Sequence, residues 1–260
     1  METPDHNAPG GHRAAKRALE LIEHIASAEA PVTLSELARQ VDLPKSSAHA
    51  LTRTLADEGY LARDHRGAFA LGPRLLRLLG RLPQRFELPR VARPTMQRLV
   101  DDLGETAILG VRQGPSVVYI EQIEAPQMIR YVAPLGEPRP LHATSIGKVF
   151  LASMSPADAD EILQQQKLER FTQHTVTSRR AILADLSSIR DHGYAVNREE
   201  SMPGIAAIAV PVHAGGTADG EVIAGLSMTG VSARMVGDLT AQAPRLVAAA
   251  AEIGAAVQRR

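Results

Sequence analysis

The stretch that most restricts the fold is residues 33–59, TLSELARQVDLPKSSAHALTRTLADEG, which holds two short helical segments with a break between them. Thr33 and Glu36 have the S/T-x-x-E spacing of a capping box, a pattern that opens a helix. Pro44 suits the first position of the second helix, and Gly59 can adopt the left-handed conformation that ends one. Two short helices joined by a tight turn indicate a helix-turn-helix unit.

The flanking residues extend this unit in both directions. Before it, HRAAKRALELIEHIASA has apolar residues at positions 18, 21, 22 and 25, the spacing of an amphipathic helix. After it, LARDHRGAFAL alternates apolar and polar residues around Arg66-Gly67, which predicts a β-hairpin. Three helices followed by a hairpin predict a winged helix-turn-helix over residues 12–72. Residues 1–11 are polar and rich in Gly and Pro, so we expect them to be disordered.

The second helix of the motif carries an unusual polar face of Lys45, Ser46, His49, Thr52 and Arg53. A solvated face more often uses long side chains with high helix propensity, such as Glu and Lys. A recognition helix instead places its N-terminal residues against base edges and phosphates in the major groove, where short hydroxyls allow close approach. The hairpin tip then forms the wing. The predicted DNA contacts are Thr33, Lys45, Ser46, Ser47, His49, Arg53 and Arg66. A winged helix used only for protein contacts is the alternative.

Composition narrows the class of protein. The chain has 29 Lys+Arg and 29 Asp+Glu, which argues against a protein that is basic all over. Residues 39–81, however, hold eight Lys or Arg against four Asp or Glu, a local positive excess of the kind that favours nucleic acid. The absence of cysteine excludes disulfides, thiolate metal sites and a cysteine nucleophile. No apolar run approaches the ~20 residues that span a bilayer, so we expect a cytoplasmic protein without a membrane partner.

The second half of the chain has a different pattern. Leucines at 75, 76, 78 and 79 predict a linker helix over residues 73–85, and so many leucines favour packing against a partner. A longer helix follows. Beyond Glu105 the pattern indicates strands: a hairpin turning at residues 113–115, then MIRYVA, GYAVNREE, GIAAIAVPV and EVIAGLSMTG. Helices lie between them, one starting at Ser155-Pro156, and residues 232–260 are mostly helical. This order predicts an α+β domain over residues 86–260, built around an antiparallel sheet flanked by helices.

Several fragments suggest catalysis without supporting it. Ser145 and Lys148 fit S-x-x-K, but the S-D-N and K-T-G motifs of the acyl-transferring serine enzymes are absent. Glu199 and Glu200 would point to opposite faces of a strand, so a solvated strand end is the better interpretation. The nine histidines lack H-x-x-x-H and H-x-H spacing. We therefore predict no catalytic residue, no metal and no cofactor.

A binding site is the better interpretation of the second domain. The helix opened by ATSIGK would present free backbone N–H groups to an anion, with Gly147 permitting close approach. Arg139 could pair with a carboxylate, and alternation in MIRYVA puts Ile129 and Tyr131 on one face. The alternatives are a helix start packed in the core without ligand, and a surface arginine in a Pro-rich loop.

Three blocks resemble one known family. SELARQVDLPKSSAHALTRTLADEGYL is similar to the DNA-binding domain of the IclR family of bacterial transcriptional regulators, with Lys45, Ser46, Ser47 and His49 matching its recognition helix. PLHATSIGKVFLA and GYAVNREESMPGIAAIAVPV resemble the family's effector-binding domain, which has a GAF-like fold. The resemblance implies a homodimeric or tetrameric regulator that binds double-stranded operator DNA. The ligand pocket that it implies consists of Tyr131, Arg139, Ser145, Ile146, Asn197, Ile205, Ala207, Ser227 and Thr229.

The leading hypothesis is therefore a ligand-responsive regulator whose effector is a small organic acid, aromatic acids such as a hydroxybenzoate included. The first helix and the leucines of residues 75–79 would form the two-fold interface, because paired operator half-sites need paired recognition helices. A tetramer would then be a dimer of dimers joined through the second domains. The rival hypotheses are an enzyme fused to a winged helix, and a DNA-binding protein without an effector.

Overall fold

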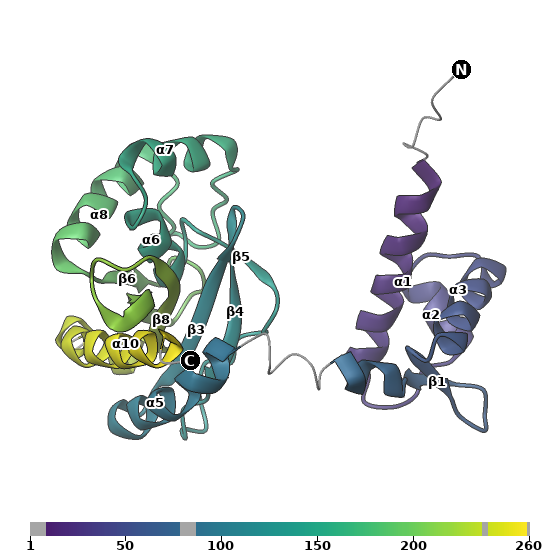
Figure 1. The fold of residues 1–260 in the computed structure, drawn as a ribbon. Coiled ribbons are helices and arrows are strands. Elements are labelled where there is room, and N and C mark those ends of the chain that lie inside the picture. The colour runs from purple at the N-terminus through teal and green to yellow at the C-terminus, as the bar shows by residue number, and fades with distance from the viewer. Residues whose placement is uncertain (1–8, 79–86, 236–238, 259–260) are drawn as a thin grey trace, which may run out of the picture. The chain divides into compact units, whose positions relative to one another are not determined.

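The computed structural model of the protein describes residues 9–78, 87–235 and 239–258. The chain divides into two compact units, Met1–Arg85 and Phe86–Arg260 (Figure 1). Each unit has a hydrophobic core of its own. Among the described helices, none is both long enough and apolar enough to cross a membrane.

The first unit is a winged helix-turn-helix, as predicted. It consists of α1 (Pro9–Ser27), α2 (Leu34–Gln40), α3 (Lys45–Asp57) and the antiparallel strands β1 (Leu61–Arg63) and β2 (Phe69–Leu71). The Thr33 hydroxyl accepts from the Glu36 amide while the Glu36 carboxylate accepts from the Thr33 amide, which completes the expected capping box. Gly59 has φ +75° directly after α3, the left-handed conformation expected there. The core is built on Leu21, Leu37 and Leu61.

Two boundaries differ from the sequence prediction. The first helix begins at Pro9, so the disorder predicted for residues 1–11 extends three residues too far; residues 1–8 lie outside the described part. Proline is well tolerated in the first turn of a helix, where its missing N–H would have no partner. Pro44 is the residue before α3 rather than its first residue, with extended ψ of 141°.

The predicted linker helix is described only in part. Residues 73–78 are helical, and residues 79–85 of the predicted segment, Leu79 among them, lie outside the described residues. Within the described turns, Leu76 and Leu78 are 69% and 45% exposed. These two partly exposed leucines are the described part of the surface that was predicted to take part in assembly.

The second unit is an α+β domain around a six-stranded sheet with the order β5-β4-β3-β8-β7-β6 and antiparallel pairing throughout. Its strands are β3 (Thr106–Gln113), β4 (Ser116–Ile123), β5 (Pro138–Pro140), β6 (Ala195–Arg198), β7 (Ile205–His213) and β8 (Val222–Val231). Its helices are α5 (Glu87–Leu103), α6 (Ser145–Ala152), α7 (Pro156–Gln165), α8 (Arg179–His192), α9 (Ser232–Met235) and α10 (Ala243–Gln258), with 3₁₀ turns at Ala214–Gly216 and Thr240–Gln242.

Helices cover both faces of this sheet. One face packs against α5 and α10, through residues such as Met96, Leu226 and Leu246. The other face packs against α6, α7 and α8, through residues such as Ile108 and Leu186. Figure 1 shows the two layers, with α5 and α10 at the bottom of this unit and α6 to α8 toward its top. The sheet is therefore buried on both sides, and polar side chains on its inner faces need an explanation.

The segment MIRYVA, predicted as a strand, is a loop. Residues 124–137 contain no strand, and the place beside β4 is taken by the short strand β5. The Thr106 hydroxyl donates to the Tyr131 carbonyl and accepts from the Ala125 amide, so these backbone groups bond a side chain instead of a neighbouring strand. Ile129 is 71% exposed while Tyr131 is half-buried, so the two do not share the face that alternation predicted.

Two glycines let the start of α6 press onto the sheet. Gly110 and Gly225 face each other across β3 and β8, and a Cβ on Gly225 would lie 2.6 Å from the Ile146 Cγ2. Gly147 is also required by packing, since a Cβ there would lie 2.3 Å from the carbonyl oxygen of Leu141. The sequence suggested that Gly147 admits a ligand; in the structure the close neighbour is the chain itself.

Candidate DNA-binding face and effector site

The predicted DNA contacts on α3 share its solvent-facing surface. Lys45, Ser46, Ser47, His49 and Arg53 are all exposed, while Ala48 at the same turns is fully buried against the core of the first unit. The short side chains therefore belong to a surface that the fold leaves uncovered, at the N-terminal end of the helix. This is the part of a recognition helix that approaches base edges.

Thr52, predicted from the sequence to lie on the polar outer face, lies on the inner face, four residues after the buried Ala48. It is fully buried, and its hydroxyl donates to the Ala48 carbonyl one turn earlier at 2.8 Å. A threonine can satisfy its hydroxyl in this way inside a helix, so its polarity did not require exposure. Thr52 is a packing residue of α3.

A hollow of about 370 Å³ lies beside α3, and one of the residues that line it is a further cation, Arg63. It is lined by His49 and Arg53 from the helix and by Arg63 and Phe69 from the hairpin. The Arg63 guanidinium lies 5.7 Å from the centre of the Phe69 ring, and Arg53 lies 3.7 Å from the Asp57 carboxylate. The sequence reading missed Arg63, although the alternation in LARDHRGAFAL that predicted the hairpin contains it.

The wing is held in shape by Asp64. Its carboxylate accepts from the amides of Arg66 and Ala68 at 2.9 and 2.8 Å, and hydrogen bonds of this kind lower the pKa of Asp64. Gly67 has φ +82°, which completes the turn. Arg66 is exposed at this tip, and its contact with DNA remains a prediction.

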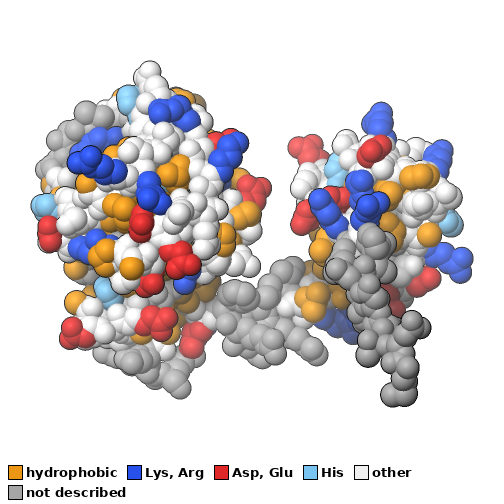
Figure 2. Space-filling view, turned by 90° about the horizontal axis from the view of Figure 1, so that it is seen from above, with side chains coloured by type: hydrophobic (Ala, Val, Ile, Leu, Met, Phe, Trp, Pro, Cys, Tyr) orange, Lys and Arg blue, Asp and Glu red, His pale blue; other side chains and the backbone are white. Residues whose placement is uncertain are grey.

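Thr33, the remaining predicted DNA contact, is exposed at the start of α2 with its hydroxyl engaged in the capping box. Over the surface in view, both basic and acidic side chains are present on each unit (Figure 2). With equal numbers of the two signs in the chain, DNA binding depends on where individual cations stand and not on overall charge.

On the inner face of the larger sheet, four neighbouring strands place one residue each in a row, and three of these residues are polar. Asn197 pairs with Ala207, Ala207 with Thr229, and Thr229 with Thr106. Ser227 and Ile205 lie two residues along their strands and so share this face. The Ser227 and Thr229 hydroxyls are 3.3 Å apart, and both residues are at least 95% buried. The register thus brings together five of the nine predicted pocket residues: Asn197, Ile205, Ala207, Ser227 and Thr229.

The start of α6 lies against this row. Thr144 caps the helix by accepting from the Gly147 amide, and the Asn197 side-chain amide donates to the Ala143 carbonyl at 2.6 Å. Among the described residues, nothing accepts a hydrogen bond from the backbone amides of Ser145 and Ile146, both of which are buried. Free amides at a buried helix start suit an anionic or carbonyl oxygen.

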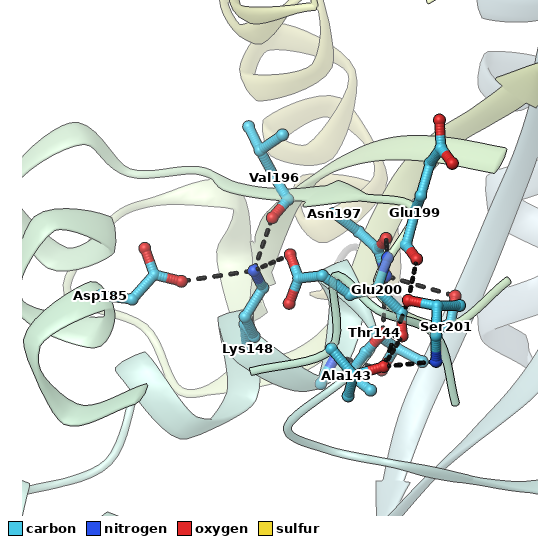
Figure 3. Close-up of polar contacts among 12 residues, drawn as sticks. Ala143, Thr144, Lys148, Asp185, Val196, Asn197, Glu199, Glu200 and Ser201 are labelled. Atoms are coloured by element: carbon cyan, nitrogen blue, oxygen red, sulfur yellow. Dashed lines mark hydrogen bonds and ion pairs between the residues drawn. The ribbon is translucent and has the colours of Figure 1, made fainter. Parts of the chain in front are cut away.

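The side-chain amide of Asn197 has little hydrogen-bonding capacity left for a ligand. Its amide nitrogen donates to Ala143 and, at 3.3 Å, to Ser201, and its oxygen accepts from the Glu200 backbone at 2.9 Å. Figure 3 shows these bonds holding the chain after β6 against the start of α6. Among the predicted pocket residues it is the one whose position is most plainly fixed by the fold.

Arg139 lies apart from the row. It is on β5, and its guanidinium lies 4.9 Å from the centre of the buried Tyr119 ring. The Arg139 Nε is buried without a partner in the described chain. Tyr119 pairs with Gly110, four residues along β3 from Thr106, which is about 13 Å at ~3.3 Å per residue. Arg139 and Tyr119 thus lie at one end of the predicted effector site, and the row from Asn197 to Thr106 lies at the other end.

Tyr119 is a polar residue of this region that the sequence reading missed. Burial raises the pKa of its hydroxyl, the nearby Tyr131 adds to this effect, and Arg139 opposes it. Together Tyr119, Tyr131 and Arg139 form a cluster that no spacing rule joins, because it is assembled from β4, a loop and β5. Its only sequence signal is the tyrosine in the strand SVVYIEQI.

The Ser145-x-x-Lys148 fragment is structural. The Lys148 ammonium donates to the Val196 carbonyl at 2.6 Å, to Glu200 at 2.7 Å and to Asp185 at 3.3 Å (Figure 3). All three of its protons are therefore used, and none of these partners is Ser145. Glu200 is 7% exposed, so the prediction that residues 199–200 form a solvated strand end is wrong for Glu200.

A separate groove of about 570 Å³ runs between α8 and the edge strand β6. Its walls include His142, Lys148, Asp185 and Tyr194, and it contains none of the nine predicted pocket residues. In residues 9–78, 87–235 and 239–258, no group of three or more His, Asp or Glu is arranged to hold a metal ion.

Comparisons with known proteins agree with this architecture. Residues 14–65 match the family model described as the IclR helix-turn-helix domain, and residues 82–255 match that of the bacterial transcriptional regulator IclR C-terminal domain. The HTH-type transcriptional regulator BhcR of Paracoccus denitrificans is 37% identical, over 94% of this chain and 87% of that protein. The acetate operon repressor of Salmonella typhimurium is 30% identical, over 91% of this chain and 86% of that protein.

Solved structures show the same fold along the chain. The Thermotoga maritima IclR is similar with a TM-score of 0.79 at 28% identity, covering 94% of this chain and 98% of that one. An IclR homolog from Microbacterium hydrocarbonoxydans, solved in complex with 4-hydroxybenzoate, has a TM-score of 0.80 at 26% identity, covering 95% and 100%. With both domain models matched in order, this chain belongs to the IclR family of bacterial transcriptional regulators and is a DNA-binding regulator, not an enzyme.

Proposed function

We propose that the protein is a ligand-responsive regulator. Residues 12–72 bind operator DNA through Lys45, Ser46, Ser47, His49 and Arg53, with Thr33 and Arg66 beside them. Residues 86–260 bind a small organic acid. Binding of the acid changes operator affinity, by an amount limited to the difference in the acid's affinity for the two states of the protein.

The observation that carries the effector site is the buried hydroxyl pair of Ser227 and Thr229. Each hydroxyl has only the other as a hydrogen-bond partner among the described residues, at 3.3 Å. Buried polar groups nearly always have a hydrogen-bond partner, and this pair has only one bond at 3.3 Å, so its spare hydrogen-bonding capacity suits a polar ligand. Ala207 pairs with Thr229 and adds no bulk beside it.

The surrounding groups favour an acid. The free amides at the start of α6 and the unpartnered Nε of Arg139 are donors, which match carboxylate oxygens. Ile146, Ile205 and Tyr131 supply apolar surface for the body of the ligand. The 4-hydroxybenzoate complex of the Microbacterium hydrocarbonoxydans homolog supports including aromatic hydroxy acids among the candidates.

Assembly is part of the proposal. Two half-sites of an operator require two recognition helices, so we expect a dimer formed through α1 and the helix that begins at residue 73. The exposed Leu76 and Leu78 support this interface. A dimer of dimers through the second units would give a tetramer.

The test is a thermal-shift screen of small organic acids, 4-hydroxybenzoate among them, followed by calorimetry on each acid that raises the melting temperature. Ser227→Ala is expected to weaken binding of a positive acid by about tenfold, since it removes one hydrogen-bond partner. Ser153→Ala, whose hydroxyl bonds only its own helix, is the matched control and should bind as the parent does. If no acid binds, or no bound acid changes operator affinity, the proposal is wrong.

A further inference from the structure

Thr106 lies in the same row as the proposed effector residues, but its hydroxyl bonds backbone groups of the protein itself. It is fully buried at the first position of β3, directly opposite Thr229 on β8. Its hydroxyl donates to the Tyr131 carbonyl at 2.9 Å and accepts from the Ala125 amide at 3.1 Å. One side chain thus joins both ends of the segment 125–131 to the sheet.

That segment has few other attachments. Met128 and Ile129 are 95% and 71% exposed, so little apolar burial holds its middle. The ion pair between Arg130 and Glu124 lies within the loop and on its surface, where it is screened by solvent. Further along, the Ala133 amide donates to the Gln122 side chain at 2.8 Å, which fixes the loop after Tyr131 but not before it.

The position of Thr106 also connects the loop with the end of α5. Glu105, the preceding residue, accepts two hydrogen bonds from the Arg234 guanidinium at 2.6 and 2.8 Å. Gly104 before it ends α5 with φ +70°. Residues 104–106 are therefore held on one side by α9 and on the other by the loop, and the junction cannot shift without breaking one of these sets of bonds.

We propose that Thr106 is a positioning residue for the effector site. This proposal rests on the effector-binding function proposed above. The Thr106 hydroxyl fixes the loop that carries Tyr131, and so fixes the side of the effector site that this loop forms. Thr106 need not touch the ligand. Without the hydroxyl, the Ala125 amide and the Tyr131 carbonyl lose their hydrogen-bond partner inside the protein. The loop then opens so that these two groups can hydrogen-bond to water.

The test is hydrogen exchange of the full-length protein, followed at the amides of residues 125–133. Thr106→Val keeps the shape of the side chain and removes the hydroxyl, and exchange of the Ala125 amide, which bonds that hydroxyl, should become about tenfold faster, a change of about 1.4 kcal/mol in the opening equilibrium. Thr106→Ser restores the hydroxyl and should return exchange toward the parent rate. Thr95→Val removes a buried hydroxyl on α5 that bonds Arg98, and should leave residues 125–133 unchanged.

A second measurement addresses the ligand. If 4-hydroxybenzoate or another screened acid binds the parent, Thr106→Val should weaken it about tenfold, Thr106→Ser should recover most of the affinity, and Thr95→Val should bind normally. If no acid binds the parent, the proposed function fails while the exchange measurement still decides the role of Thr106. Unchanged exchange in Thr106→Val, or equally fast exchange in Thr106→Ser, overturns the inference.

Discussion

Lys148 and Glu200 form a buried ion pair in the second unit, with Nζ 2.7 Å from Oε1 and the two residues only 4% and 7% exposed. The pair joins α6 to the turn after β6, across 52 residues of sequence. Removing one partner of such a pair leaves the other charge largely buried and uncompensated. The pair therefore fixes the start of α6, where the proposed effector site lies.

Lys148→Met should destabilise the protein by about 3–5 kcal/mol, because Glu200 keeps its buried charge without a partner. Urea unfolding followed by circular dichroism measures the change. Arg98→Ala removes one member of a pair in which both side chains are 57% exposed, and should cost less than about 1 kcal/mol. Equal effects of the two variants would contradict this account of the buried pair.

Arg53→Ala should weaken operator binding by about 1–3 kcal/mol and relax specificity at one base pair if Arg53 reads a base. If it contacts a phosphate, affinity should fall for all sequences alike and the salt dependence should become shallower. Fluorescence anisotropy at several salt concentrations separates the two cases. Arg112→Ala, in the second unit, is the control, and unchanged binding by Arg53→Ala would remove Arg53 from the interface.

The Thr33 side chain and then its backbone amide hydrogen-bond the Glu36 carboxylate and lower the pKa of Glu36. A carboxyl whose pKa is lower in the folded state stabilises that state above its unfolded pKa, about 4.3, and this contribution is lost as pH falls through the lowered value. Thr33→Ala should move the pKa of Glu36 back toward its ordinary value in a carbon-13 NMR titration, and Thr33→Ser should not. An unchanged pKa in Thr33→Ala would show that the capping box is absent in solution.

Leu76→Glu should convert the dimer to a monomer at micromolar concentration, since a charge would be placed in the proposed two-fold interface. Light scattering after size exclusion gives the mass. Met128→Glu, at an exposed position of the second unit, should leave this dimer intact. A parent protein that is already monomeric under these conditions would refute the interface.

Arg139→Ala should weaken binding of the identified acid by at least about tenfold if the guanidinium holds the carboxylate, because hydrogen bonds to a charged group contribute about 1.5–3 kcal/mol. Calorimetry measures it beside Arg112→Ala, which removes a cation from the same domain. If Arg139→Ala and Ser227→Ala both bind the acid as tightly as the parent, the pocket lies elsewhere.

What the sequence by itself determined was local. The capping box at Thr33, the turn at Gly59 and the hairpins at residues 66–67 and 113–115 follow from the backbone preferences of a few neighbouring residues. Ala207 and Thr229 were predicted as pocket residues only through the family resemblance, and the strand register then places them side by side. The family resemblance added the order of the domains, which the comparisons confirm.

Only the tertiary structure decided which distant groups meet. Thr106 and Thr229 face each other because of strand register, Lys148 meets Glu200 through the packing of α6, and the Tyr131 carbonyl, in a loop, accepts from the Thr106 hydroxyl. In each case a polar group is satisfied by a partner that the packing supplies, and the spacing of residues along one segment carries no information about that partner.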